Sequence, residues 1–189
     1  MVLTAVNLAQ VKGFGEFEYW FAMIKIAVIV GFLIIGVLLW LGVLPASGFV
    51  GFDNVRESGF APNGIAGIAA GLLAVAFAFG GIEVVTIAAA ESENPADNVK
   101  RAVNSIIWRI AVFYLGSVAV ITLLLPYASI DGADSAADSP FTAVLEMANI
   151  PGAAAFMEVV IVLALLSAFN AQLYGTSRLG YQSVSYTHL

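Results

Sequence analysis

The sequence predicts an all-α membrane protein with four transmembrane helices. Apolar residues make up 61% of the 189 residues and charged residues only 11%, against about 45–50% and about 25% in an ordinary globular domain. The apolar residues also gather in four long stretches that are separated by polar or charged loops. A water-soluble fold has too little interior for so much apolar surface, so we expect the chain to lie in a lipid bilayer.

Each of the four apolar stretches is long enough to span the bilayer, which takes about 20 helical residues. They cover residues 17–44, 64–90, 102–127 and 151–178. A further apolar segment, residues 1–11, is too short to span and predicts the end of a preceding membrane helix. Asn94-Pro95 predicts the start of the third helix, and Ser139-Pro140 predicts a short surface helix before the fourth.

Lysines and arginines near the ends of the spans predict the orientation of the chain. If the spans alternate, five basic residues lie on one side of the membrane and only Arg56 lies on the other. The five are Lys12, Lys100, Arg101, Arg109 and Arg178. Because basic residues favour the cytoplasmic side, we expect these five inside and the loop with Asp131, Asp134 and Asp138 outside.

Composition also argues against several functional classes. The chain carries 13 acidic and 7 basic residues, a net charge of −6, so we expect no nucleic-acid partner. Cysteine is absent, and the one histidine, His188, lies near the end of the chain. We therefore expect no disulfide, no metal site, no cofactor and no enzymatic activity, because no nucleophile–base pair or set of metal ligands is present.

The second span contains the pattern that points most directly to a binding site. Gly80-Gly81 interrupts the apolar run and Glu83 follows. Adjacent glycines allow a membrane helix to unwind, and the freed N–H groups of the second half can then bind a carboxylate. Phe77 and Phe79 flank this break and are placed to cover a ligand. The alternative is that the glycines only allow neighbouring helices to pack closely.

In addition to Glu83, three further polar residues lie within the spans. An unpaired carboxylate at mid-bilayer costs about 2.5–3.5 kcal/mol, so Glu83 faces a polar cavity, pairs with a base or is protonated. Lys25 either extends toward the cytoplasmic headgroups or points inward as a cation available for proton transfer. Ser167 and Asn170 lie three residues apart, hence on one helix face, where they can bind an ion or another helix.

Taken together, four segments resemble the bacterial amino-acid permeases of the amino acid–polyamine–organocation superfamily. They are GEFEYWFAMIK (15–25), FAFGGIEVVTIAAAESENP (77–95), AVNSIIWRIAVFYLGS (102–117) and NAQLYGTSR (170–178). EVVTIAAAES followed by NSIIWRI is most similar to the 4-aminobutyrate permease branch. The resemblance covers residues 3 to about 179. It implies the end of the fourth helix through the eighth helix of a fold built on a five-plus-five inverted repeat, with its broken helix at Gly80-Gly81.

The resemblance implies a multi-pass transporter of the plasma membrane that takes up an amino acid such as 4-aminobutyrate by symport with a proton, or with sodium. It assigns substrate binding to Phe77, Phe79, Gly80, Gly81 and Glu83, and ion or proton coupling to Lys25, Ser167 and Asn170. Because the family's first helix is missing here, we expect at most half of a binding site. Residues 184–189 resemble a string found at the ends of unrelated sequences, and we expect a non-native tail there. A non-transporting scaffold or subunit with four helices is the alternative.

Overall fold

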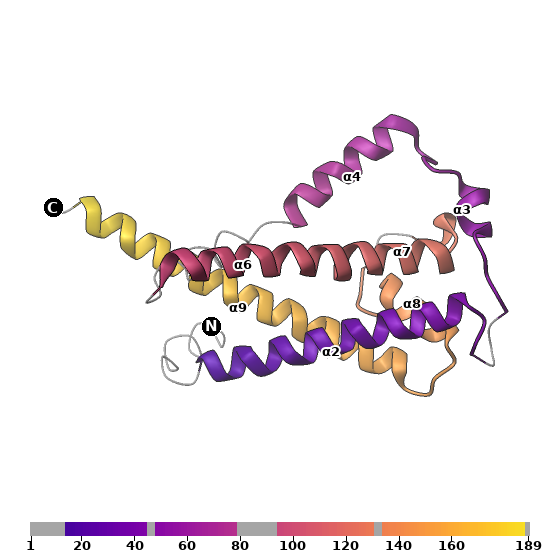
Figure 1. The fold of residues 1–189 in the computed structure, drawn as a ribbon, viewed down its shortest axis with the longest axis horizontal. Helices are drawn as coiled ribbons and strands as arrows, with labels where there is room; N and C mark the ends of the chain where they lie inside the picture. The colour runs from indigo at the N-terminus through magenta and orange to yellow at the C-terminus, as the bar shows by residue number, and fades with distance from the viewer. Residues whose placement is uncertain (1–13, 45–47, 79–93, 131–133, 188–189) are drawn as a thin grey trace.

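The computed structural model describes residues 14–44, 48–78, 94–130 and 134–187, and every regular element in these ranges is a helix (Figure 1). The elements are α2 (Phe14–Trp40), α3 (Asp53–Ser58), α4 (Gly64–Ala78), α6 (Pro95–Arg109), the π-helical turn η1 (Ile110–Tyr114), α7 (Leu115–Leu124), the 3-10 turn η2 (Tyr127–Ser129), α8 (Pro140–Met147) and α9 (Ala153–Thr187). The predicted all-α class is confirmed for the described residues.

Three helical segments are long and apolar enough to cross a membrane. They are Tyr19–Trp40, Pro95–Leu124 and Ala153–Leu173, and Gly64–Ala76 is a shorter apolar helix. These segments agree with the membrane character that the composition predicts. The rest of the predicted second span lies in residues 79–93, outside the described part of the chain. The count of four spans and the inverted repeat therefore stay predictions.

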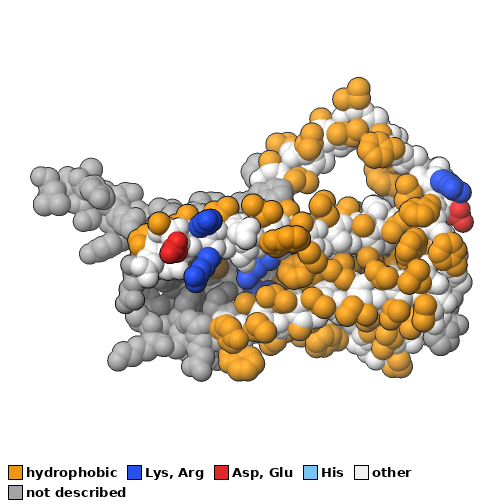
Figure 2. Space-filling view, viewed as in Figure 1, with side chains coloured by type: hydrophobic (Ala, Val, Ile, Leu, Met, Phe, Trp, Pro, Cys, Tyr) orange, Lys and Arg blue, Asp and Glu red, His pale blue; other side chains and the backbone are white. Residues whose placement is uncertain are grey.

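Among the three long helical segments, α2 packs against both α7 and α9 (Figure 1). α6, η1 and α7 follow one another without interruption and form one long rod. Hydrophobic side chains cover much of the face seen in Figure 2, and charged side chains gather over α6 and around α3. Arg56 of α3 therefore lies at the opposite end of the rod from Lys100 and Arg101 of α6 (Figure 1).

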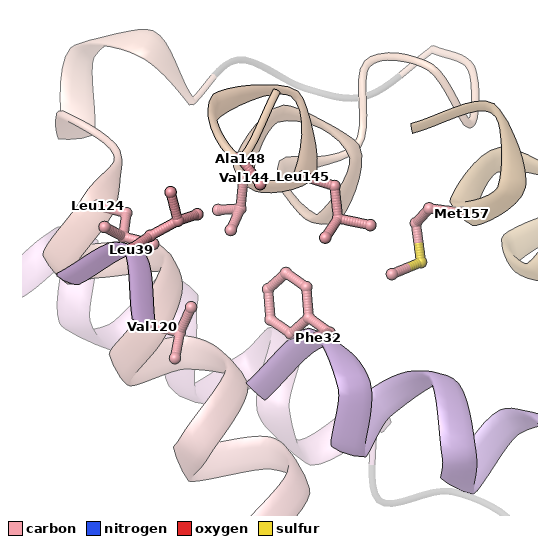
Figure 3. Packing of buried hydrophobic residues seen from close by; sticks show 8 residues of the cluster. All are labelled: Phe32, Leu39, Val120, Leu124, Val144, Leu145, Ala148 and Met157. Carbon is pink, nitrogen blue, oxygen red and sulfur yellow. The ribbon is translucent and has the colours of Figure 1, made fainter. Parts of the chain in front are cut away.

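The hydrophobic core lies at the α3 end of the molecule, where four helices meet (Figure 3). Phe32 and Leu39 come from α2 and pack with side chains of the other three helices. The latter are Val120 and Leu124 of α7, Val144, Leu145 and Ala148 of α8, and Met157 of α9. The ring of Phe32 lies 4.8 Å from that of Phe141 on α8, measured between centroids. This core fixes how α2 and α9 face each other further along the bundle.

Glycine allows α2 and α7 to approach closely beside this core. A Cβ atom on Gly36 would overlap with the Cγ1 atom of Val120, and one on Gly116 would lie 3.2 Å from Leu33 Cδ2. Side chains at these two positions would push the helices apart. Small residues are used in this way at helix interfaces in membranes, where close backbone approach gains van der Waals contact.

Both predicted helix starts are confirmed, although they are capped differently. α8 begins at Pro140, and the Ser139 hydroxyl accepts a hydrogen bond from the Phe141 N–H at 3.3 Å. α6 begins at Pro95, but the side chain of Asn94 makes no capping hydrogen bond. Proline itself needs no cap for its missing N–H and presets the helical φ angle, which accounts for the start at Pro95.

The segment between α2 and α4 joins the ends of α2 and α7. Trp40 Nε1 donates to the carbonyl of Gly51 at 2.7 Å, and Asn54 Nδ2 of α3 donates to the carbonyl of Leu123 at 2.9 Å. The second bond satisfies a carbonyl in the last turn of α7, which has no partner within its own helix. Beyond α3, Asn63 Nδ2 donates to Tyr127 Oη at 2.6 Å, so the entrance to α4 is attached to η2.

Candidate functional site

Lys25 and Ser167, two of the three residues assigned to ion or proton coupling, are in direct contact. The Nζ atom of Lys25 donates a hydrogen bond to the Oγ atom of Ser167 at 2.8 Å. Lys25 is half-buried and Ser167 is only 7% exposed. The side chain of Lys25 therefore points toward α9, which decides between the two orientations that the sequence left open.

The spacing of buried residues on each helix explains why these two side chains meet. On α2, Lys25 precedes Phe32 by two helical turns and lies on the face that carries the core residues Phe32 and Leu39. On α9, Ser167 lies on the face that carries the buried Met157 and Val160. The contact is thus the continuation, toward the predicted cytoplasmic end, of the α2–α9 interface that begins in the core.

Both residues lie within the membrane-spanning part of their helices, nearer to the predicted cytoplasmic edge than to the outer edge. At 1.5 Å per residue, Lys25 lies about 22 Å from the Trp40 end of α2, and Ser167 lies about 21 Å from the Ala153 end of α9. The hydrocarbon layer is about 30 Å thick. A charge at that depth is expensive, so an ionisable residue there needs a polar partner and is a candidate functional residue. Here the hydroxyl of Ser167 is such a partner.

A lysine paired with a hydroxyl can keep its hydrogen bond in both protonation states. The ammonium form can donate to Ser167 Oγ across the 2.8 Å that separates the two atoms. A neutral amine keeps two N–H groups and can still donate to the same oxygen. Loss of the proton therefore removes a charge from the interface while the hydrogen bond between Lys25 and Ser167 can remain. The pair is chemically suited to hold and release a proton.

Asn170, the third residue assigned to coupling, follows Ser167 by one turn on α9 and is half-buried. The structure thus places Asn170 one turn from the hydrogen bond that joins Lys25 of α2 to Ser167 of α9. Among the described residues, no group of three His, Cys, Asp or Glu side chains could hold a metal ion.

The residues assigned to substrate binding fall at the limit of the described chain. Phe77 belongs to the last turn of α4, where only the backbone is described. Phe79, Gly80, Gly81 and Glu83 lie outside the described residues. The unwinding of the helix at Gly80-Gly81 and the role of Glu83 therefore remain predictions.

The sequence reasoning missed one irregular feature of the long rod, the π-helical turn Ile110–Tyr114. Its residues are apolar or aromatic and include neither glycine nor proline, so no local pattern distinguishes them from α-helix. π-Helical turns inside α-helices are frequent at functional sites. None of the five residues is buried in the described part of the chain.

Comparison with known proteins agrees with these observations. Residues 1–184 match the family model described as amino acid permease. The chain is 69% identical to the aromatic amino acid transport protein AroP of Corynebacterium glutamicum over 92% of its length. It is 46% identical to the gamma-aminobutyric acid permease of Bacillus subtilis over 96% of its length, and 39% identical to the lysine-specific permease LysP of Escherichia coli over 95%.

The chain spans 38% of the length of each of these three relatives. No solved structure matches it. The resemblance noted in the sequence is thereby confirmed, and the three helices that can cross a bilayer make the chain a multi-pass protein of the plasma membrane. The matched family model and the high identity over nearly all of its residues show that this chain belongs to the amino acid permease family.

Proposed function

We propose that the full-length protein is a secondary active transporter that takes up an amino acid across the plasma membrane by symport with a proton. Membership of the permease family supports transport of an amino acid, in preference to an enzyme or a four-helix scaffold. The single observation that supports proton coupling is the hydrogen bond from Lys25 Nζ to Ser167 Oγ within the membrane-spanning part of α2 and α9.

In this mechanism Lys25 holds the coupled proton as its ammonium group. Release of the proton removes one charge from the α2–α9 interface, while the hydroxyl of Ser167 keeps the two helices joined. A state of the carrier in which polar groups surround Lys25 is stabilised when the lysine is charged. A state in which apolar groups enclose Lys25 is stabilised when the lysine is neutral. Protonation thus biases the exchange between outward-open and inward-open states. A unit charge crossing 100 mV gains about 2.3 kcal/mol, which is available to drive uptake.

The substrate binds at the proposed break in the second span. Free N–H groups after Gly80-Gly81 bind the substrate, and Phe77 and Phe79 cover it. The carboxylate of Glu83 gates access to this site. Exposed N–H groups at the start of a half-helix suit an anionic group such as a carboxylate. All amino acids carry that group, so this part of the site supports the substrate class without selecting its side chain.

Two candidate substrates follow from the relatives. The similarity of residues 83–92 and 104–110 to 4-aminobutyrate permeases supports 4-aminobutyrate. The gamma-aminobutyric acid permeases of Bacillus subtilis and Escherichia coli, 46% and 40% identical, support it too. The relative that is 69% identical is named an aromatic amino acid transport protein, and this higher identity favours an aromatic amino acid.

Uptake by the full-length protein in sealed membrane vesicles tests both points. Radiolabelled 4-aminobutyrate and radiolabelled phenylalanine are compared under an imposed pH gradient, an imposed sodium gradient, and neither. We expect accumulation of one of them that follows the pH gradient. Accumulation that ignores the pH gradient, or that follows sodium, would contradict proton coupling. Failure to accumulate any amino acid in vesicles that contain folded protein would contradict the transport function.

A further inference from the structure

A cavity of about 640 Å³ lies along the first part of the long rod. It is open on the side of α6, because the six described residues that line it are all exposed and share one face of that helix: Asp97, Lys100, Arg101, Val103, Asn104 and Ile107. Lys100, Asn104 and Ile107 follow one another at helical spacing and form one face. The cavity is therefore polar and basic toward the start of α6 and apolar toward Ile107. This order along the helix matches an amphiphilic ligand with an anionic head.

The length of the rod places this cavity at the boundary of the bilayer. Pro95–Leu124 has 30 residues and is about 45 Å long, against about 30 Å for the hydrocarbon layer. If Leu124 lies at one edge of that layer, about 15 Å of α6 extends beyond the other edge. Lys100 and Arg101 then lie at the depth of the lipid headgroups, and Ile107 lies at the depth of the acyl chains.

Exposed side chains beside the cavity agree with this placement. Trp108 is 66% exposed and Ile107 is 58% exposed. Both lie on α6, which also holds three basic residues. Tryptophan is enriched at the boundary between headgroups and acyl chains, where its amphipathic ring is stable. The surface just beyond the basic residues is thus suited to lipid rather than to water.

We propose that this cavity binds the headgroup of one anionic phospholipid that carries headgroup hydroxyls, such as phosphatidylglycerol. Lys100 and Arg101 bind the phosphate through charge-assisted hydrogen bonds. Asp97 and Asn104 bind the headgroup hydroxyls, which explains how an acidic residue fits into an otherwise basic anion site. An acyl chain lies against Val103 and Ile107. Net charge favours this occupant, because two cations and one carboxylate face the cavity.

The test measures which phospholipids remain bound to the purified full-length protein. Protein is reconstituted in vesicles of equal phosphatidylglycerol and phosphatidylcholine, extracted in mild detergent, and analysed for bound lipid by native mass spectrometry. We expect the wild type to retain phosphatidylglycerol in preference. Each of Lys100→Gln and Arg101→Gln should reduce that preference about fivefold, since one basic residue near an anionic surface has an effect of that size.

Arg56→Gln is the matched control, because it removes an exposed cation at the opposite end of the rod. It should leave the preference unchanged, and Lys100→Arg should retain it. Addition of glycerol phosphate distinguishes a lipid from a soluble anion, because a soluble anion site would release phosphatidylglycerol under that competition. The proposal is wrong if both glutamine variants retain phosphatidylglycerol like the wild type, as they would if another part of the full-length chain covers α6. It is equally wrong if Arg56→Gln reduces retention as much as they do.

Discussion

The ammonium group of Lys25 and the hydroxyl of Ser167 are joined by a 2.8 Å hydrogen bond across 142 residues of sequence. The bond connects α2 to α9 inside the membrane, beyond the hydrophobic core that packs the same two helices. Because the core holds the helices at one end, the polar contact depends on their relative position at the other. A movement of α9 against α2 would change the surroundings of the lysine, as the proposed proton coupling requires.

Substitution Lys25→Ala should abolish uptake driven by a pH gradient, because the group proposed to carry the proton is removed. Exchange of labelled for unlabelled substrate needs binding and movement but no net proton transfer, so it should remain. Both are measured in the same vesicles with the full-length protein. Loss of exchange together with coupled uptake would indicate a structural role for Lys25 and would contradict its role in coupling.

Substitution Ser167→Ala should reduce pH-driven uptake about tenfold or more. A hydrogen bond to a charged group contributes about 1.5–3 kcal/mol, and the alanine variant removes the acceptor for Lys25 inside the membrane. Ser167→Thr keeps a hydroxyl and should retain most of the activity. If alanine and threonine give the same coupled rate, the hydroxyl has no part in coupling.

Substitution Gly36→Ala should destabilise the protein by about 1–3 kcal/mol, because the new Cβ overlaps with Val120 and forces α2 away from α7. Gly31→Ala is the control on the same helix, since nothing lies within 4 Å of a Cβ there. Thermal unfolding in detergent measures the difference. Adding Val120→Ala to Gly36→Ala should restore part of the loss, and no recovery would show that the overlap is not its cause.

Substitution Asn54→Ala should cost about 0.5–1.5 kcal/mol, because it removes the donor to the carbonyl of Leu123 at the end of α7. The control is Glu57→Gln on the same short helix, whose side chain is exposed. Hydrogen exchange in the last turn of α7 should increase in the alanine variant alone. Equal exchange in both variants would mean that α3 does not stabilise that turn.

Substitutions Gly80→Ala and Glu83→Gln distinguish a carrier from a scaffold. If the chain unwinds at Gly80-Gly81 to bind substrate, alanine should restore regular helix and raise the substrate concentration needed for half-maximal uptake. Glu83→Gln should slow uptake if the carboxylate gates access. Gly71→Ala, where nothing lies within 4 Å of a Cβ on α4, is the control for a harmless methyl group. Unchanged uptake in both test variants would contradict the broken-helix site.

The sequence predicted the elements of this fold well where the signal is local. Apolar runs of the right length identified the long helices, and Asn94-Pro95 and Ser139-Pro140 identified two helix starts. The π-helical turn at Ile110–Tyr114 was not predictable, because its residues are ordinary helix residues and only the backbone geometry distinguishes it. The attachment of α3 to α7 through Asn54 was equally hidden, since nothing near Asn54 indicates a carbonyl 69 residues later.

For the candidate site, the sequence determined the kinds of residue and the tertiary structure decided their association. Composition indicated that the chain lies in lipid. Motif similarity assigned ion or proton coupling to Lys25, Ser167 and Asn170. Whether Lys25 points to headgroups or to another helix depends on which face of α2 packs against α9. That choice follows from the close fit of Gly36 to Val120 and from the core around Phe32. Such contacts join residues that are far apart in the chain, so only the folded arrangement of the helices could fix the direction of the lysine side chain.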